Sequence, residues 1–275
     1  MQDTGLKRNT TDQFYTKKEV ANTCLDHWYK IVNPKEDELI IEPSAGNGAF
    51  SSKIMESHIS FQALDIDPKS KEIKKIDFLQ LNIDLFPHKK IHFIGNPPFG
   101  RQSSLAKKFI KHICASPKTA TISFILPKSF RKESMQRCFP LRYNIVFELE
   151  ISKDAFLINE KAYNVPCVFQ IWEKKDTDRY ITPDIEPAGY SFVKKDENPD
   201  YSIRRVGVYA GSISTATQDK SSQSHYFIKL KENNELDINT YWTFIDDLDK
   251  VSTNTVGPKS ISKKEIIPRL NFVVS

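Results

Sequence analysis

The residues best suited to chemistry are Asn96, Pro97, Pro98 and Phe99, which directly follow the apolar run 91–94. An apolar strand that ends at a polar residue and two prolines places a rigid loop at its carboxyl end, where open α/β sheets bind ligands. The Asn96 side-chain oxygen and the Pro97 carbonyl oxygen are acceptors, and Phe99 offers a flat face. Two acceptors beside an aromatic plane suit a flat ring with an exocyclic amine, above all adenine.

The chemistry that this loop favours is activation of that amine. The lone pair of the amine nitrogen is drawn into the ring, and acceptance of both of its hydrogens returns electron density to the nitrogen. The amine is then prepared to attack an electrophile. Asn-Pro and Pro-Pro are also ordinary turn signals, so this interpretation depends on the strands upstream.

A second loop with possible chemistry follows a strand predicted at 38–42. It runs Pro43-Ser44-Ala45-Gly46-Asn47-Gly48 and precedes a predicted amphipathic helix. Glycines in such a unit let the backbone approach a ligand closely. The dinucleotide fingerprint needs a third glycine where this chain has Ser51, so a pyrophosphate site and a dinucleotide oxidoreductase are weakly supported. Glu42, at the end of the strand, fits a ligand with an ammonium group better than a phosphate.

Two further acids follow the next strands. Asp65 ends a strand predicted at 59–64, where a carboxylate can accept hydrogen bonds from two ribose hydroxyls. Asp77 and Phe78 place a carboxylate and a ring where an adenine amine and face could meet them. A solvated loop aspartate is the alternative for each acid taken singly. Acids at three successive strand ends favour one ligand site.

Upstream of these strands, residues 1–12 are polar and lack periodicity, which predicts a flexible N-terminal arm. Phe14, Tyr15 and Thr16 then precede a predicted helix. Thr16 as N-cap and Glu19 three residues later predict a capping box at its start.

Downstream of the Asn96 loop, strands are predicted at 120–126, 143–151 and 165–172. The connection between the last two strands, 152–164, is predicted to be a flexible loop over the site. The expected fold class is α/β, with a doubly wound, Rossmann-like sheet and a catalytic domain at 13–174.

The C-terminal residues 175–275 are richer in charge and proline, and we expect a small β-rich or mixed module with a possible role in target recognition. Its basic residues could contact a phosphate backbone, although a solvated surface is the alternative for any single one. These residues are Arg204, Arg205, Lys229, Lys259, Lys263, Lys264 and Arg269.

Composition bounds the class of protein. The chain has 275 residues, a net charge of +5 and 39% hydrophobic residues, which suffices for one full-sized domain and a smaller one. No run approaches about 18 apolar residues and the N-terminus lacks a signal-peptide layout, so we expect a soluble, intracellular protein without a membrane partner, in the cytoplasm or in a eukaryotic nucleus. The four cysteines favour buried free thiols, and no metal is expected.

Taken together, the motifs resemble those of class I S-adenosylmethionine-dependent amino-methyltransferases, in particular the N6-adenine methyltransferases of nucleic acids. The run 42–48 is similar to their cofactor-binding motif, and Asn96-Pro97-Pro98-Phe99 is similar to their catalytic NPPF motif. The resemblance covers roughly residues 12–174.

This resemblance implies S-adenosylmethionine as the cofactor. It implies that the segment 14–16 closes over the methionine part of the cofactor. It further implies that Asp65 holds the ribose, and that Asp77 and Phe78 hold the adenine.

The implied substrate is adenine in a nucleic acid, with DNA favoured and RNA possible. The same loop chemistry also serves guanine N2 in RNA and the glutamine amide in proteins. For the glutamine amide alone, a tyrosine would be expected at position 99, where this chain has phenylalanine. The module at 175–275 is smaller than many recognition domains of this family, so either the target that it reads is short, or a protein partner or the shape of the nucleic acid supplies specificity. A non-catalytic methyltransferase-fold subunit is the alternative of another class, although the catalytic loop and the glycine turn are both intact here.

Overall fold

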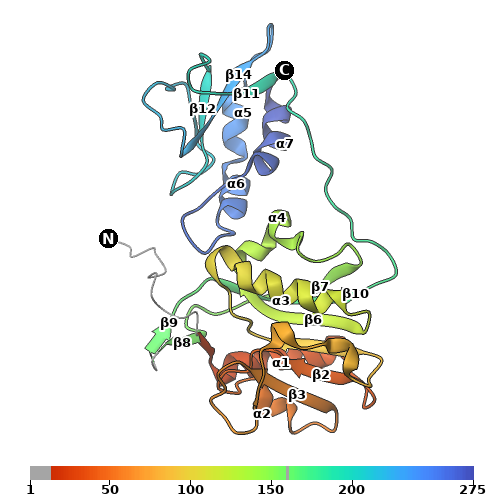
Figure 1. Cartoon of the computed structure of the whole chain (residues 1–275). Helices are drawn as coiled ribbons and strands as arrows, with labels where there is room; N and C mark the ends of the chain where they lie inside the picture. Colours follow the sequence, from red (N-terminus) through yellow and green to blue (C-terminus); the bar gives the residue numbers. More distant parts are fainter. Residues whose placement is uncertain (1–13, 159–160) are drawn as a thin grey trace. The chain divides into compact units, whose positions relative to one another are not determined.

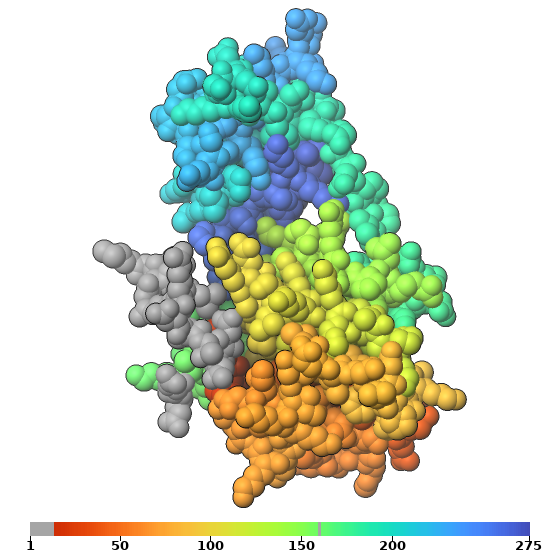
Figure 2. Space-filling model, viewed as in Figure 1, coloured from red at the N-terminus to blue at the C-terminus, as the bar shows by residue number. Residues whose placement is uncertain are grey.

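The computed structural model describes residues 14–158 and 161–275, so the arm predicted at 1–12 lies outside the described residues. The chain divides into two compact units, the first ending at Tyr180 and the second spanning Ile181–Ser275. On the face shown in Figure 2, the segment from β3 to α3, coloured orange to yellow, forms much of the visible surface of the first unit.

The first unit is built on a seven-stranded sheet. Its strands, in the order in which they pair, are β4 (Lys74–Lys75), β3 (Ser60–Asp65), β2 (Leu39–Glu42), β5 (Ile91–Gly95), β6 (Thr119–Pro127), β10 (Cys167–Lys174) and β7 (Tyr143–Glu150). Figure 1 labels β2, β3, β6, β7 and β10 of this sheet. The first five strands are parallel, and β10 is antiparallel to both of its neighbours. The strand order reverses between β2 and β5, as in a doubly wound sheet. The Rossmann-like α/β fold expected from the sequence is therefore confirmed.

Helices cover both faces of this sheet. Side chains of successive strand residues point to opposite faces. Phe93 of β5 packs in one core cluster with Phe109 of α3 (Ser104–Ala115), which lies beside β6 in Figure 1. The preceding residue, His92, points to the other face and contacts Trp28 of α1 (Lys18–Val32). Because both faces are covered, β5 is buried along its whole length, as parallel strands usually are.

The capping box predicted at Thr16 and Glu19 is wrong. The N-cap of α1 is Lys17, which makes no side-chain cap. Thr16 belongs instead to β1 (Tyr15–Thr16), and its hydroxyl accepts a hydrogen bond from Asn96. A contact across 80 residues of sequence has replaced the local cap.

The connection predicted as a loop at 152–164 contains two strands. They are β8 (Phe156–Ile158) and β9 (Lys161–Tyr163), both labelled in Figure 1, and with β1 they form an antiparallel sheet in the order β1-β8-β9. The amphipathic helix predicted after the glycine turn is only the single turn α2 (Ser51–Ile54). The remaining short elements are η1 (Phe78–Gln80), η2 (Ile83–Leu85), η3 (Arg101–Ser103), η4 (Lys128–Arg131) and α4 (Glu133–Gln136).

The second unit is mixed α and β. Its antiparallel sheet has the order β11 (Tyr190–Val193), β14 (His225–Leu230), β12 (Tyr201–Arg204) and β13 (Ile213–Ser214). Its helices are α5 (Ile238–Thr243), α6 (Ile245–Ser252) and α7 (Lys263–Val273). Ile203 and Ile228 of the sheet share one core with Leu248 and Leu270 of the helices. Among the described residues of the whole chain, no helix is long and apolar enough to cross a membrane.

Candidate active site

A cavity of about 300 Å³, here called the carboxyl-edge cavity, lies where β2, β3 and β5 end and the strand order reverses. Ligands of open α/β sheets bind at this position. The structure brings these predicted site residues together in its lining: Phe14, Tyr15, Pro43, Ser44, Gly46, Asp65, Asp77, Phe78, Asn96, Pro97, Pro98 and Phe99. Three other predicted residues, Thr16, Glu42 and Gly48, lie outside the lining.

The side chain of Asn96 has a fixed orientation. Its Nδ2 donates hydrogen bonds to the Phe14 carbonyl oxygen and to Thr16 Oγ1, both at 3.2 Å. Because a carbonyl oxygen only accepts, the amide nitrogen must face β1 and the amide oxygen must face away. Asn96 Oδ1 is buried and has no hydrogen-bond partner among the described residues. An unpaired buried acceptor typically costs ~1–3 kcal/mol, so this oxygen suits a donor on a ligand.

The backbone of the Asn96 loop is also held in place. Ser44 Oγ donates to the Asn96 carbonyl oxygen at 3.1 Å, which ties the loop to the glycine turn. The Phe99 carbonyl oxygen accepts from the backbone N–H of Leu105 at 3.1 Å. Between them, Gly100 has φ of 69°, and a Cβ there would lie 2.9 Å from the Leu105 nitrogen. The loop therefore needs glycine at this position to enter α3.

The glycine turn and β3 are joined through Asp65. Its Oδ2 accepts from Gly46 N–H at 2.7 Å, and its Oδ1 accepts from Asp67 N–H at 2.8 Å. A carboxylate has about four acceptor positions, so about two remain for a ligand. Gly46 has φ of 54°, and a Cβ there would lie 3.2 Å from the Tyr15 ring. The turn thus packs directly against β1.

Asp77 and Phe78 form another part of the wall. Asp77 is exposed, and its Oδ1 accepts from Leu79 N–H at 3.0 Å, which caps η1. Phe78 is almost fully buried and packs against Phe93 and Phe109. Phe78 therefore belongs to the core as well as to the cavity.

Aromatic rings gather beside Asn96. Phe99 is only 7% exposed and lies 6.1 Å from Phe14, ring centroid to ring centroid. Phe14 in turn stacks on Tyr163 at 5.3 Å. Tyr163 was not predicted as a site residue. The available signal was an aromatic residue in a connection expected to lie over the site.

Glu42 lies behind the cavity rather than in it. The residue is 2% exposed, and its carboxyl accepts a hydrogen bond from Ser51 Oγ. Burial raises the pKa of Glu42 to about 8, the Ser51 hydrogen bond opposes this shift, and the charge of Asp65 adds to it. The carboxyl is therefore mostly protonated at neutral pH.

Comparisons with known proteins give structural matches alone. No protein-family model and no curated protein matches the chain. Similar solved structures include a candidate RNA methyltransferase from Pyrococcus horikoshii, with 15% identity and a TM-score of 0.45, covering 62% of this chain and 92% of that one. A candidate class I S-adenosylmethionine-dependent methyltransferase from Listeria monocytogenes has 16% identity and a TM-score of 0.44, covering 66% and 67%. An S-adenosylmethionine-dependent methyltransferase from Anabaena variabilis has 10% identity and a TM-score of 0.42, covering 59% and 88%.

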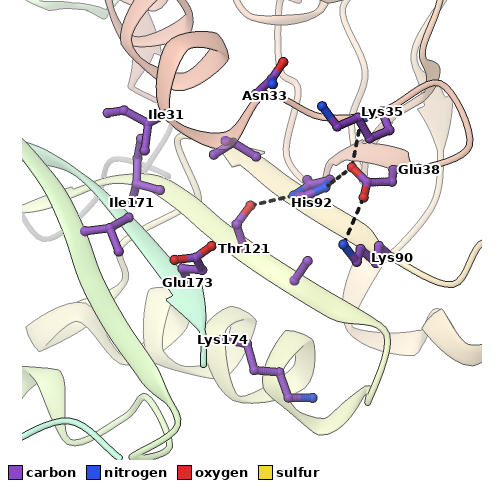
Figure 3. Close-up of a pocket in the computed structure, with 13 residues that line it drawn as sticks. Ile31, Asn33, Lys35, Glu38, Lys90, His92, Thr121, Ile171, Glu173 and Lys174 are labelled. Carbon is purple, nitrogen blue, oxygen red and sulfur yellow. Dashed lines mark hydrogen bonds and ion pairs between the residues drawn. The ribbon is translucent and has the colours of Figure 1, made fainter. Parts of the chain in front are cut away.

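A second cavity in the first unit, of about 290 Å³, lies at the amino ends of β5 and β6 and is here called the amino-edge cavity (Figure 3). His92 hydrogen-bonds Glu38 Oε2 through Nε2 and Thr121 Oγ1 through Nδ1, both at 2.9 Å. The Lys35 backbone N–H donates to Glu38 at 2.8 Å, and Lys90 forms an ion pair with it at 3.4 Å.

The protonation states in this network agree with its hydrogen bonds. Burial lowers the pKa of His92, although its bond to Glu38 opposes the shift. For Glu38, hydrogen bonds from the Lys35 backbone and His92 together outweigh burial and lower the pKa. A neutral His92 then donates to an ionised Glu38 and accepts from the Thr121 hydroxyl.

Proposed function

We propose that the chain is an S-adenosylmethionine-dependent methyltransferase that transfers a methyl group to the N6 amine of adenine in DNA. The observation that carries this proposal is the buried, unpartnered Asn96 Oδ1 at the carboxyl-edge cavity. An adenine amine has two hydrogens to donate. One would satisfy Asn96 Oδ1 and the other would reach the Pro97 carbonyl oxygen.

The residues around the cavity fit the cofactor. The cavity volume of about 300 Å³ is at the lower end of the range for ligand sites. The remaining acceptor positions of Asp65 would take the ribose hydroxyls, and Asp77 with Phe78 would take the adenine. Tyr15 and Gly46 would border the methionine part. S-adenosylmethionine supplies an electrophilic methyl group when it is bound.

The task of the protein in this reaction is positioning. Asn96 would hold the amine nitrogen through an oxygen whose direction is fixed by the two bonds of Nδ2 to Phe14 and Thr16. The rings of Phe14 and Phe99 border the place of the base, which must be single-stranded or flipped from a duplex. Correct alignment alone can contribute several orders of magnitude in rate. The nitrogen would gain the methyl group as the methyl–sulfur bond of the cofactor breaks and leaves a neutral thioether, and the nitrogen would lose one proton to solvent, while the Asn96 amide stays neutral.

Glu42 has a conditional part in this proposal. A protonated carboxyl cannot balance the ammonium group of the cofactor. Contact with that group would therefore require Glu42 to lose its proton, and binding near neutral pH would release that proton to the buffer. Calorimetry of cofactor binding in two buffers of different ionisation enthalpy measures this release.

The experiment that tests the function is methyl transfer from isotopically labelled S-adenosylmethionine to matched DNA and RNA, single-stranded and duplex, followed by digestion to nucleosides. Wild type and Asn96→Ala are assayed together, and cofactor binding is measured separately. We expect label in N6-methyldeoxyadenosine that is lost in the variant while cofactor binding persists. Label in N6-methyladenosine or N2-methylguanosine would show that the substrate is RNA and not DNA. Cofactor binding without label in any nucleoside would contradict a nucleic-acid substrate and favour a non-catalytic or protein-directed role.

A further inference from the structure

The second unit has a cavity of its own, of about 740 Å³, that the proposed reaction does not use. It lies around the end of β11, the start of β14 and the start of α7, and its lining falls within residues 192–263. Four of its lining residues are cationic: Lys194, Lys195, Arg205 and Lys263. Asp196 is the one carboxylate among the described lining residues.

These four cations differ from three lysines of the same unit that are paired with carboxylates. Lys220, Lys250 and Lys259 each form an ion pair with an aspartate. Within residues 14–158 and 161–275, no ion pair with a carboxylate involves any of the four cavity cations. Their positive charges are therefore not neutralised by a direct contact with a carboxylate.

Two of the cations contact aromatic rings of the cavity. Lys263 Nζ lies 4.2 Å from the centroid of the Phe192 ring and 5.8 Å from that of Tyr226. The Arg205 guanidinium lies 5.3 Å from the same Tyr226 centroid. The Tyr226 hydroxyl donates to the Ile261 carbonyl oxygen at 3.2 Å, which fixes the ring. Each cation is attracted to the ring face, which holds the charge at the cavity without neutralising it.

We infer that this cavity binds the phosphate backbone of a single-stranded nucleic acid. The inference rests on the proposed function, since that function requires a nucleic-acid strand. Four cations around a cavity of this size offer more positive charge than one phosphate group needs. Phe192 and Tyr226 add partly exposed rings, and base stacking on rings beside a positively charged groove is the usual way of binding single strands.

The test is fluorescence anisotropy of labelled single-stranded DNA and RNA oligonucleotides with the full chain, without cofactor, over a series of salt concentrations. The double variant Arg205→Gln/Lys263→Gln removes two cavity cations. Lys231→Gln/Lys250→Gln removes the same formal charge from exposed lysines of the same unit outside the lining and is the matched control. Thermal unfolding of each variant confirms that it is folded.

We expect the cavity variant to bind a strand roughly tenfold more weakly at low salt, with a slope of log affinity against log salt smaller by about 0.7 for each cation removed. The control should change affinity much less. Equal losses in both variants would overturn the inference, because only general charge would matter. Displacement of the oligonucleotide by inorganic phosphate or adenosine monophosphate at equal phosphate concentration would also overturn it in favour of a free anion.

This result is separate from the outcome for methyl transfer. Strand binding that depends on Arg205 and Lys263, without any methyl transfer, would support the cavity and contradict the proposed reaction. Methyl transfer that depends on Asn96, with strand binding unchanged in the double variant, would support the reaction and contradict the cavity.

Discussion

The two cavities of the first unit have nearly equal volumes, about 300 and 290 Å³, and lie at opposite ends of the parallel strands of one sheet. The two cavities differ in whether their buried polar atoms have hydrogen-bond partners. In the amino-edge cavity, both ring nitrogens of His92 are hydrogen-bonded, to Glu38 and Thr121. In the carboxyl-edge cavity, Asn96 Oδ1 has no partner among the described residues. A satisfied network stabilises a fold, whereas an unpaired acceptor costs stability and needs another explanation. Hydrogen-bond satisfaction, and not cavity size, distinguishes the candidate active site.

Loss of the unpaired acceptor should have the largest effect. We expect Asn96→Ala to lower the single-turnover rate of methyl transfer on the order of 10²–10³-fold, or about 3–4 kcal/mol, because the amine is no longer held in place. The affinity for S-adenosylmethionine should stay within about threefold. Rapid-quench kinetics and calorimetry measure the two quantities. An equal loss of cofactor affinity would move Asn96 from substrate positioning to cofactor binding.

Glu42 and Glu38, the buried acids beside the two cavities, should respond to pH in opposite directions, because the pKa of Glu42 is raised and that of Glu38 is lowered. The pKa of Glu42 is about 8 in the folded state and about 4.5 when unfolded, so the folded state binds more protons between these values. Stability is therefore lost as pH rises through this window. We expect the advantage of Glu42→Gln over wild type to grow by about 3 kcal/mol between pH 5 and pH 8, as urea unfolding at several pH values would measure. Parallel pH curves for the two proteins would refute a protonated Glu42.

Disruption of the satisfied network should change stability but not activity. Thr121→Val keeps the side-chain volume and leaves His92 Nδ1 without its donor. We expect a loss of ~1–3 kcal/mol in the free energy of unfolding. Methyl transfer and cofactor affinity should remain near those of wild type. A rate loss comparable to that of Asn96→Ala, with stability unchanged, would end the distinction between the two cavities.

The parts of the site that the sequence predicted depend on local pattern. Gly46 and the prolines at 97 and 98 mark loops at strand ends, and Asp65 marks the end of a strand. Parallel strands bring such ends to one edge, so the grouping of these residues in one cavity follows from the fold. Their contacts with a ligand stay predictions.

The parts that the sequence did not predict depend on contacts between distant segments. The hydroxyl of Thr16 is used by Asn96 and not by its own helix. Tyr163 of β9 reaches the Phe14 ring because β9 pairs with β8 and β8 pairs with β1. The proton on Glu42 depends on burial and on Ser51. None of these contacts has a signature in a single local stretch of sequence.

The smallest effect is expected from a variant that changes a hydrogen bond orienting the Asn96 amide but leaves its unpaired oxygen in place. Thr16→Val removes one of the two acceptors of Asn96 Nδ2 and leaves both the Phe14 carbonyl oxygen and Asn96 Oδ1 in place. We expect a loss of about 1 kcal/mol in the free energy of unfolding, as for one ordinary hydrogen bond, which urea unfolding would measure. The rate of methyl transfer should fall by less than about tenfold, because the remaining bond still orients the amide. A rate as low as that of Asn96→Ala would show that attachment to β1, rather than the acceptor itself, is what the reaction needs.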